Sequence, residues 1–178
     1  LLLFVGLGLL AACAPSVPEQ VNGVTMIRAS QTNDIQTGHV DALNAYRTSR
    51  GQQPVQLNAQ LTAAAKTHAR DMSVQERAWH FGSDGSSPRD RAERAGFQGR
   101  VLGENISESF DDEITVFQSW VNDPVTSRVM LSPGADSVGF GWYQEPTGKL
   151  WWVQLIGQSG FSPLIARAAD AYPVTPGS

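Results

Sequence analysis

The sequence contains a single cysteine in 178 residues. One thiol, Cys13, cannot form a disulfide within this chain, so a disulfide-stabilised scaffold is excluded. Stability must come from a hydrophobic core, and 41% hydrophobic residues are enough to build one. We expect one domain of ordinary size.

Basic residues are also scarce. The chain has 13 Lys and Arg against 17 Asp and Glu, which gives a formal net charge of -4. It contains no block of basic residues and no stripe that combines basic with aromatic residues. Nucleic-acid-binding domains carry such a basic footprint. We therefore expect no nucleic-acid partner.

The hydrophobic run at the N-terminus is too short to cross a bilayer. Residues 1–12 are all apolar or Gly, but a helix of that length spans only ~18 Å. Such a run is typical of the hydrophobic region of a signal peptide. Neither an initiator Met nor a Lys- or Arg-containing segment precedes it, so we interpret its start as truncated.

The run ends in Leu10-Ala11-Ala12-Cys13, which resembles a bacterial lipobox. This resemblance implies cleavage before Cys13 and a diacylglycerol anchor on its thiol, which would attach the protein to a membrane. Ala14 is not the Asp that retains such lipoproteins at the inner membrane. We expect an extracytoplasmic, lipid-anchored protein, at the outer membrane if the source is a diderm bacterium. The alternative is an ordinary signal peptide with a chance cysteine.

The rest of the chain divides into a tether, a folded domain and a tail. Residues 13–33 hold Cys13 and a flexible tether, residues 34–161 the domain, and residues 162–178 a loose tail. Capping residues and apolar spacing predict helices over residues 35–49, 59–76 and 88–95, and a fourth from residue 112 to Pro124. Strands are predicted over residues 101–107, 137–144 and 150–157, the last two as a hairpin. This order predicts an α+β fold.

A series of short motifs between residues 40 and 157 occurs in a specific order, although each is weak alone. They are Leu43-Asn44-Ala45-Tyr46-Arg47, His68-Ala69-Arg70-Asp71-Met72, His80 with the turn from Gly82 to Pro88, Gly103-Glu104-Asn105-Ile106, Trp120-Val121-Asn122-Asp123-Pro124, Val138-Gly139-Phe140-Gly141 and Trp152-Val153-Gln154. By these motifs the chain resembles the CAP superfamily (cysteine-rich secretory proteins, antigen 5 and pathogenesis-related 1 proteins), in its bacterial, disulfide-free SCP-domain branch. The resemblance implies a three-layer α-β-α sandwich with a central, mainly antiparallel sheet.

The resemblance also implies a central cleft with two histidines and two acidic residues, which bind a divalent metal in some members. His80 matches the first histidine, Glu104 the acid of the Gly-Glu-Asn motif, and Asp123 the second acid. Thr126 stands where the second histidine is expected. His80, Glu104 and Asp123 alone make a poor zinc site. We expect at most a weakly bound divalent metal and no other cofactor.

The individual polar residues also have plainer interpretations. His80 is a cleft residue that acts as a ligand or base, or one that fixes its loop by bonding to Glu104. His68 lies on an apolar helical stripe and is predicted to be a core histidine with a local partner. His39 has no acidic partner at a telling spacing and is predicted on a surface helix. Ser87 is predicted to cap a helix, and no nucleophile elbow surrounds it, so we assign no residue to catalysis.

The resemblance leads us to expect a cell-envelope CAP-domain lipoprotein that acts as a binding module, since family members have been linked to sterol and lipid binding. Its ligand would be an apolar or amphiphilic molecule or another envelope component. Gly139 and Gly141 leave one strand face bare, which lets a helix or a ligand approach closely. The alternatives are a hydrolase that uses His80, Glu104 and a weakly bound metal, and a structural or interaction protein with a vestigial cleft. We expect a monomer.

Overall fold

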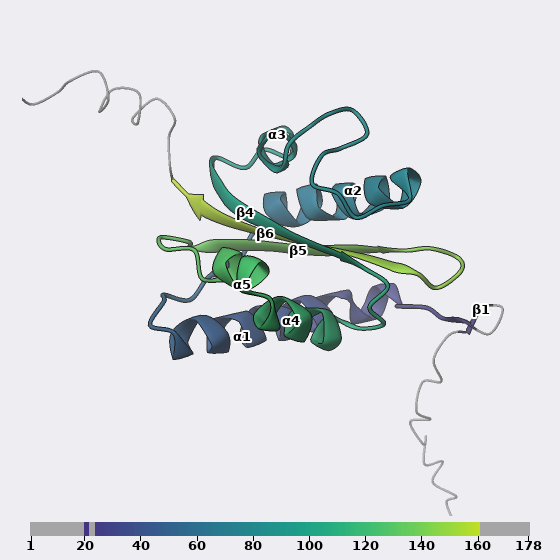
Figure 1. Ribbon diagram of the computed structural model, residues 1–178, viewed down its shortest axis with the longest axis horizontal. Helices are drawn as coiled ribbons and strands as arrows, with labels where there is room; N and C mark the ends of the chain where they lie inside the picture. Colours follow the sequence, from purple (N-terminus) through teal and green to yellow (C-terminus); the bar gives the residue numbers. More distant parts are fainter. Residues whose placement is uncertain (1–19, 22–23, 161–178) are drawn as a thin grey trace, which may run out of the picture.

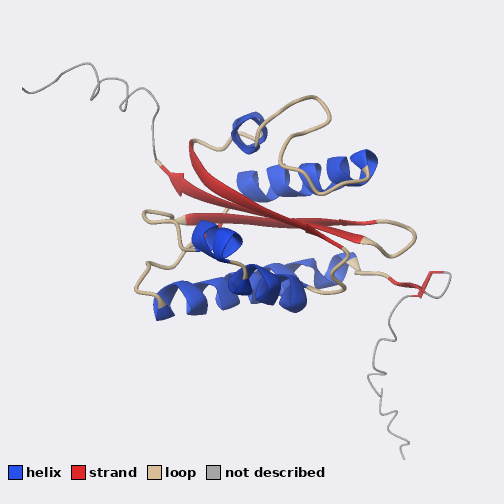
Figure 2. Cartoon of the chain, in the orientation of Figure 1, coloured by secondary structure: helices blue, strands red, loops and turns tan. Residues whose placement is uncertain are grey.

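The computed structural model of the protein describes residues 20–21 and 24–160, which form three layers (Figures 1 and 2). A four-stranded sheet is the middle layer, and helices cover both of its faces. The predicted α+β fold class is confirmed. The signal peptide predicted for residues 1–12, Cys13 and the tail predicted for residues 162–178 lie outside the described residues. Among the residues that are described, no helix is both long and apolar enough to cross a membrane.

The sheet has the strand order β3 (Gln56–Leu57), β5 (Ser137–Gln144), β6 (Leu150–Ser159) and β4 (Gly99–Glu108). β5 and β6 form the predicted antiparallel hairpin, and β4 pairs antiparallel with β6. The short β3, which we did not predict, pairs in parallel with β5. β4 is therefore an edge strand of this sheet. A separate pair of two-residue strands, β1 (Gln20–Val21) and β2 (Val24–Thr25), precedes the domain.

The helices divide between the two faces of the sheet (Figure 1). α2 (Ala59–Gln75) and α3 (Pro88–Arg94) cover one face, and α1 (Thr32–Ser49), α4 (Glu113–Asn122) and α5 (Pro124–Met130) cover the other. A 3₁₀ helix, η1 (Ala29–Gln31), leads into α1. α4 ends before Pro124, as predicted, but Pro124 also opens α5, which we did not predict. Proline suits the first position of a helix because the N–H that it lacks would have no helical partner there.

Side-chain caps explain where these helices begin. Asn58 Oδ1 accepts a hydrogen bond from the Leu61 N–H at the start of α2. At α3 the Ser87 hydroxyl and the Asp90 carboxylate cap each other's backbone N–H groups, and Pro88 takes the first helical position. The predicted role of Ser87 as a helix cap is confirmed.

The bare face of β5 packs directly against α2. A Cβ atom at Gly139 would lie 2.2 Å from the backbone carbonyl carbon of Leu61, and one at Gly141 would lie 2.8 Å from the backbone nitrogen of Lys66. The space that these glycines leave is therefore filled by a helix rather than by a ligand. The opposite face of β5 places Phe140 in the core beneath α1 and α4.

His39 lies in the core, so its predicted surface position is wrong. Its exposed fraction is 1%, and its ring stacks on Phe140 with 3.6 Å between the ring centroids. Gln154 Nε2 donates a 2.8 Å hydrogen bond to His39 Nε2. Burial lowers the pKa of His39 to about 3, which keeps the ring neutral. The hydrogen-bond partner of His39 is the side-chain amide of Gln154, on a strand that is distant in the sequence. The absence of nearby acidic residues therefore does not indicate an exposed histidine.

The ordered contacts of the domain begin before residue 34, within the stretch predicted as a tether. The Ile27 N–H donates a 2.8 Å hydrogen bond to Gln144 Oε1, and the Ile27 side chain packs against the core on the α1 side. The end of the segment before α1 is thereby attached to the β5–β6 hairpin.

Candidate functional site

Glu104 and Asn105 are neighbours on the edge strand β4 and point to opposite faces of the sheet. Side chains alternate along a strand, so Glu104 meets residues from the α2 and α3 side, and Asn105 meets the α5 side. Asn105 Nδ2 donates hydrogen bonds to the Thr126 carbonyl at 3.0 Å and to Gln154 Oε1 at 3.1 Å. The Gly-Glu-Asn motif thus supplies one polar group to each layer.

Both carboxylate oxygens of Glu104 are engaged within the protein. Oε1 accepts a 2.9 Å hydrogen bond from His80 Nδ1, and Oε2 accepts a 2.7 Å hydrogen bond from Arg91 Nη2. The Glu104 side chain is 1% exposed and that of Arg91 is 6% exposed. His68 Nε2 also lies 3.8 Å from Oε1. The charge of the buried carboxylate is therefore balanced by a buried guanidinium, which such a group requires.

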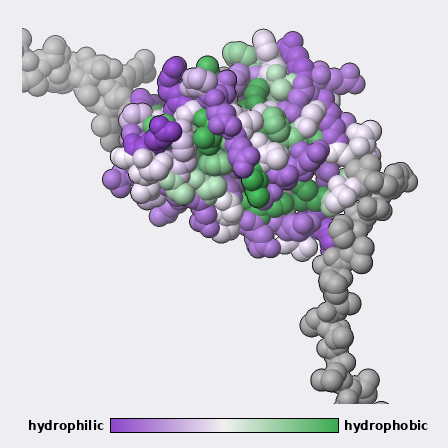
Figure 3. Space-filling model, turned by 60° about the horizontal axis from the view of Figure 1, so that its bottom comes forward, coloured by the Kyte–Doolittle hydropathy of each residue, from purple (hydrophilic) through white to green (hydrophobic). Residues whose placement is uncertain are grey.

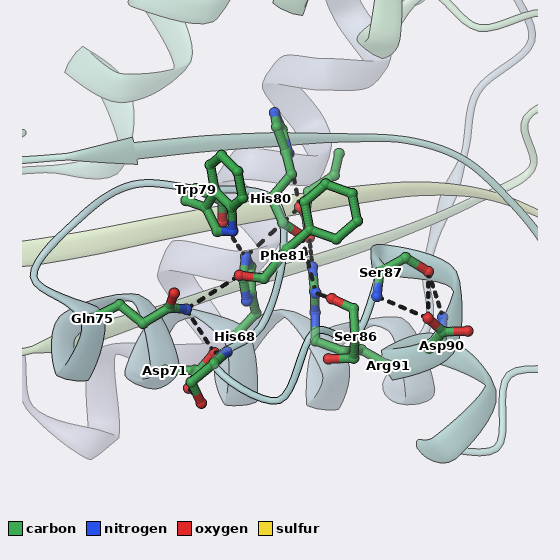
Figure 4. A network of polar contacts seen from close by, with 12 residues as sticks. His68, Asp71, Gln75, Trp79, His80, Phe81, Ser86, Ser87, Asp90 and Arg91 are labelled. Carbon is green, nitrogen blue, oxygen red and sulfur yellow. Dashed lines mark hydrogen bonds and ion pairs between the residues drawn. The ribbon is translucent and has the colours of Figure 1, made fainter.

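The segment from Trp79 to Phe81 is fixed at three consecutive backbone carbonyls (Figure 4). His68 Nε2 donates to the Trp79 carbonyl at 2.8 Å, Arg91 Nη1 to the His80 carbonyl at 3.1 Å, and Gln75 Nε2 to the Phe81 carbonyl at 3.2 Å. The predicted core position of His68 with a local partner is confirmed. Burial lowers the pKa of His68, although the nearby Glu104 carboxylate acts in the opposite direction.

The same segment exposes two aromatic side chains on either side of an imidazole. Trp79 is 41% exposed and Phe81 is 47% exposed, and their ring centroids lie 5.5 Å apart at a tilt of 51°. The Arg77 guanidinium lies 4.0 Å from the centroid of a Trp79 ring, so Arg77 covers part of the indole. We call residues 77–81 the aromatic loop.

The His80 side chain is 54% exposed although its Nδ1 is held by Glu104. A carboxylate oxygen can only accept, so Nδ1 carries a proton, and Nε2 has no hydrogen-bond partner among the described residues. Figure 4 shows this second nitrogen pointing away from the polar network. An oriented imidazole of this kind can accept a proton, bind a polar ligand group or contribute one ligand to a metal.

Asp123 and Thr126 belong to the junction between α4 and α5. Asp123 Oδ1 caps α5 by accepting hydrogen bonds from the N–H groups of Val125 at 2.8 Å and Thr126 at 2.9 Å. These backbone hydrogen bonds lower the pKa of Asp123. The Thr126 hydroxyl donates to the Trp120 carbonyl at 2.8 Å, and its own carbonyl accepts from Asn105. These contacts are those of a helix cap next to β4.

A metal site made of His80, Glu104 and Asp123 stays a prediction. Within residues 20–21 and 24–160, no group of three or more His, Cys, Asp or Glu side chains is arranged to hold a metal ion. Glu104 already accepts hydrogen bonds on both oxygens, and its partner Arg91 is a cation. The geometry instead makes Glu104 the group that orients His80.

Two residues of this network were not found from the sequence: Arg91 and Gln75. Arg91 lies in α3 beside Ala92, which is completely buried. An arginine next to the apolar face of a short capped helix is a signal that could have indicated a buried guanidinium. Gln75 carries no such signal, because its contact depends on the path of the loop after α2.

Comparison with known proteins assigns the family. The model of the CAP family, described as the cysteine-rich secretory protein family, matches residues 40–156. The chain is also 26% identical over 148 residues to the uncharacterized protein YkwD of Bacillus subtilis (strain 168). That match covers 83% of the chain and 56% of YkwD, so the chain spans little more than half of this relative.

Solved structures with the same fold come from several bacteria. An outer surface protein from Borrelia burgdorferi matches with a TM-score of 0.65 and 16% identity, over 72% of this chain and 95% of that one. An extracellular protein containing an SCP domain from Bacillus anthracis str. Ames also gives a TM-score of 0.65, with 22% identity, over 81% of this chain and 45% of that one. Together with the family match, the order of motifs and the three-layer fold, these findings show that the chain belongs to the bacterial CAP superfamily of SCP-domain proteins.

Proposed function

We propose that this chain is an extracytoplasmic CAP-domain protein that binds an apolar or amphiphilic ligand of the cell envelope at its aromatic loop. The carrying observation is that Trp79 and Phe81 are exposed while the backbone between them is fixed by His68, Arg91 and Gln75. Large exposed aromatic side chains are unfavourable in water, and a fixed backbone lowers the entropy that binding must overcome. Both features favour a binding surface.

The chemistry of the loop favours a ligand with an apolar and a polar part. The two aromatic rings supply apolar area. His80, the residue between Trp79 and Phe81, supplies a polar group through its Nε2. Arg77 adds a positive charge at the edge of Trp79. Because Arg77 already covers part of the indole, the loop is better suited to an acyl chain or fused ring lying against Trp79 and Phe81 than to a flat ring stacked on Trp79 alone.

The proposed location rests on the relatives and on the N-terminal sequence. Two proteins of the same fold are described as extracellular and as an outer surface protein. Leu10-Ala11-Ala12-Cys13 supports a lipid anchor at Cys13, which would hold the domain near a membrane. Mass spectrometry of the protein from its native cells tests the anchor, because lipidation adds a diacylglycerol mass to the peptide that begins with Cys13.

The ligand proposal is tested by titrating the purified protein with dodecanoate and with cholesterol sulfate while the indole N–H signal of Trp79 is followed by NMR. We expect the Trp79 signal to move, and Trp79→Ala or Phe81→Ala to weaken binding about tenfold, which corresponds to the loss of ~1.4 kcal/mol of binding free energy. Ile114→Ala is the matched control, because Ile114 is 60% exposed on α4 in the opposite layer. The view in Figure 3, turned so that the underside of Figure 1 comes forward, shows several hydrophobic patches among hydrophilic residues. Failure of both probes to bind, or equal weakening by Ile114→Ala, contradicts the proposal.

A hydrolase is the second candidate, and the hydrogen bond from His80 Nδ1 to Glu104 is the observation that favours it. A carboxylate that orients an exposed imidazole is an arrangement used for general base catalysis and for metal-ligand support. Calorimetric titration with Zn²⁺ and Mg²⁺, comparing the protein with His80→Ala and Asp123→Ala, tests the metal part. If the protein binds one of these metals and both variants lose this binding, His80 and Asp123 share a metal site. Hydrolysis of an ester or peptide substrate that survives in His80→Ala contradicts a catalytic role. If neither ligand nor metal binds, a structural protein with a vestigial cleft is the remaining interpretation.

A further inference from the structure

The outer edge of β4 is a strand edge without the usual features that block pairing. β4 is the last strand of the sheet, beyond β6, and it runs between α3 on one side of the sheet and α5 on the other (Figure 1). A bulge between Val101 and Gly103 interrupts its pairing with β6, so the regular edge begins at Gly103. From Gly103 to Glu108 the edge contains neither Pro nor Lys, with which proteins commonly prevent unwanted strand pairing.

One hydrogen bond shows which residues of β4 direct their backbone away from the sheet. The Ser109 N–H donates to the Leu150 carbonyl at 2.9 Å, so Ser109 faces β6. Backbone groups alternate in direction along an antiparallel pair, so Glu104, Ile106 and Glu108 direct their N–H and C=O outward. No backbone or side-chain group of the described residues bonds to the N–H or C=O of Glu104 or Ile106. This row of donors and acceptors is complementary to another extended backbone.

The two sides of this edge differ in chemistry. Glu104 points toward α2 and α3, where its carboxylate holds His80 of the aromatic loop. On the opposite side Asn105 Nδ2 bonds to the Thr126 carbonyl, and the Thr126 N–H bonds to Asp123 Oδ1. Asp123 is exposed and forms no ion pair with any described residue. One side of the edge is therefore aromatic, and the other carries an unbalanced negative charge.

We propose that the edge of β4 binds an extended peptide segment of a partner protein as an additional antiparallel strand, with apolar side chains toward the aromatic loop and basic side chains toward Asp123. Residues that lie opposite each other in an antiparallel pair have their side chains on the same face. The partner residues that exchange hydrogen bonds with Glu104 and Ile106 therefore place their side chains on the side of the aromatic loop. The residues between them reach the α5 side, where a basic group meets the charge of Asp123.

Charge also distinguishes a peptide from a second copy of this chain. An antiparallel pair of two β4 strands would bring the Asp123 side chains of both copies to the same side of the sheet, where like charges repel each other. A basic peptide removes this repulsion. The proposal does not rest on the binding of an amphiphile by the aromatic loop, because the hydrogen bonds that carry it come from the backbone of β4.

The test is a titration of the isotope-labelled protein with the peptide acetyl-Lys-Val-Lys-Val-Lys-Val-Lys-amide, in which amide hydrogen exchange is followed by NMR. We expect the amides of Glu104 and Ile106 to exchange about tenfold more slowly at saturation, because each gains an acceptor. The amides of Asn105 and Ser107 already face β6 and should change less. Unchanged exchange at Glu104 and Ile106 overturns the proposal. Slow exchange in the protein alone, with dimers in sedimentation, also overturns it, because a second copy then occupies the edge.

Methylation of the peptide backbone tests the antiparallel pairing. The valines would lie opposite Glu104, Ile106 and Glu108 and exchange hydrogen bonds with them, whereas the lysine N–H groups would point to solvent. We expect N-methylation of the valines to weaken binding about tenfold or more, and N-methylation of the lysines to weaken it much less. Equal binding of the two methylated peptides, or the reverse order, overturns the proposal.

Asp123→Asn tests the role of charge. Asparagine caps helices as well as aspartate does, so α5 should keep its start while the negative charge is removed. We expect this variant to bind the lysine peptide about threefold more weakly at low salt. Asp41→Asn removes the same charge from an exposed position on α1 and should leave the affinity unchanged. Equal affinities of the original protein and Asp123→Asn, or equal weakening by both variants, overturn the preference for a basic peptide.

Discussion

The exposed imidazole of His80 is held by an almost completely buried carboxylate, since Nδ1 of His80 lies 2.9 Å from Oε1 of Glu104 and the two side chains are 54% and 1% exposed. Glu104 is thus a buried group that fixes the orientation of a side chain on the surface, that of His80. Its second oxygen is bonded to Arg91, which also holds the His80 carbonyl. The side chain and the backbone of His80 are therefore positioned by the same buried ion pair.

This arrangement predicts that Glu104→Ala is strongly destabilising. The substitution leaves the Arg91 guanidinium buried without its counter-charge, and breaking a buried pair in this way costs about 3–5 kcal/mol of unfolding free energy. Urea denaturation measures the loss. Glu93→Ala is the control, because Glu93 forms an ion pair with Arg89 on the exposed side of the same helix, and both side chains are about half exposed or more. Equal stability losses in the two variants would contradict the buried-pair interpretation.

The sequence predicted the fold more fully than the site. Helix caps such as Ser87 and the glycine pair Gly139 and Gly141 are local signals, and each predicted element that carried one is present. His80 and Glu104 were paired correctly as one of two alternatives. The buried state of His39 was missed because its partner Gln154 lies 115 residues away in the sequence, and Arg91 was missed although its partner Glu104 is only 13 residues away. Pro124 was ambiguous for a different reason: the same residue that ends α4 suits the start of α5.

Burial of His39 makes the stability dependent on pH. Its pKa is about 3 in the folded protein and about 6.5 in the unfolded chain. Between these values the unfolded chain binds a proton that the folded protein does not, so stability falls as the pH falls below about 6.5. We expect this group to remove roughly 2–3 kcal/mol of unfolding free energy between pH 7 and about pH 4.5, as measured by urea denaturation at each pH.

The variant His39→Leu isolates this contribution. It is less stable at pH 7, because Gln154 Nε2 loses its acceptor, but it should lose less further stability on acidification than the original protein. His68 has a pKa that burial also lowers, so it adds to the same trend in both proteins and cancels in the comparison. If the unfolding free energies of the original protein and of His39→Leu fall in parallel as the pH is lowered, His39 does not stay neutral in the core.

Two glycines allow opposite predictions for the same substitution. Gly139→Ala places a Cβ 2.2 Å from the backbone of Leu61 and must push α2 away from the sheet, so we expect a loss of about 3 kcal/mol or more. Gly38→Ala adds a methyl group in open space on α1, where alanine is the better helix former, and should stabilise by about 0.5–1 kcal/mol. Thermal unfolding of both variants tests the pair. A stable Gly139→Ala protein would contradict the close approach of α2 to β5.

The buried Arg47 of α1 joins segments that are distant in the sequence through backbone carbonyls. Its side chain donates to the carbonyls of Gln53 at 2.7 Å, Met130 at 2.6 Å, Ser132 at 3.3 Å and Ala135 at 3.4 Å. The exposed fraction is 0%, and burial lowers the pKa of this guanidinium. Arginine has five donors in a planar fork, which lets a single side chain reach several carbonyls, whereas a lysine ammonium is a compact group with three.

Arg47→Met should therefore reduce the unfolding free energy by roughly 3 kcal/mol or more, because each buried carbonyl left without a donor costs about 1–3 kcal/mol. Arg47→Lys should recover only part of the loss, since its shorter reach and smaller number of donors leave some of these carbonyls unpaired. Arg50→Met, one turn later on the exposed surface, should change stability by less than about 0.5 kcal/mol. Urea denaturation of the three variants measures these changes in unfolding free energy. Full recovery by lysine would mean that the charge of Arg47, rather than its fork of donors, holds the C-terminal ends of α1 and α5 together.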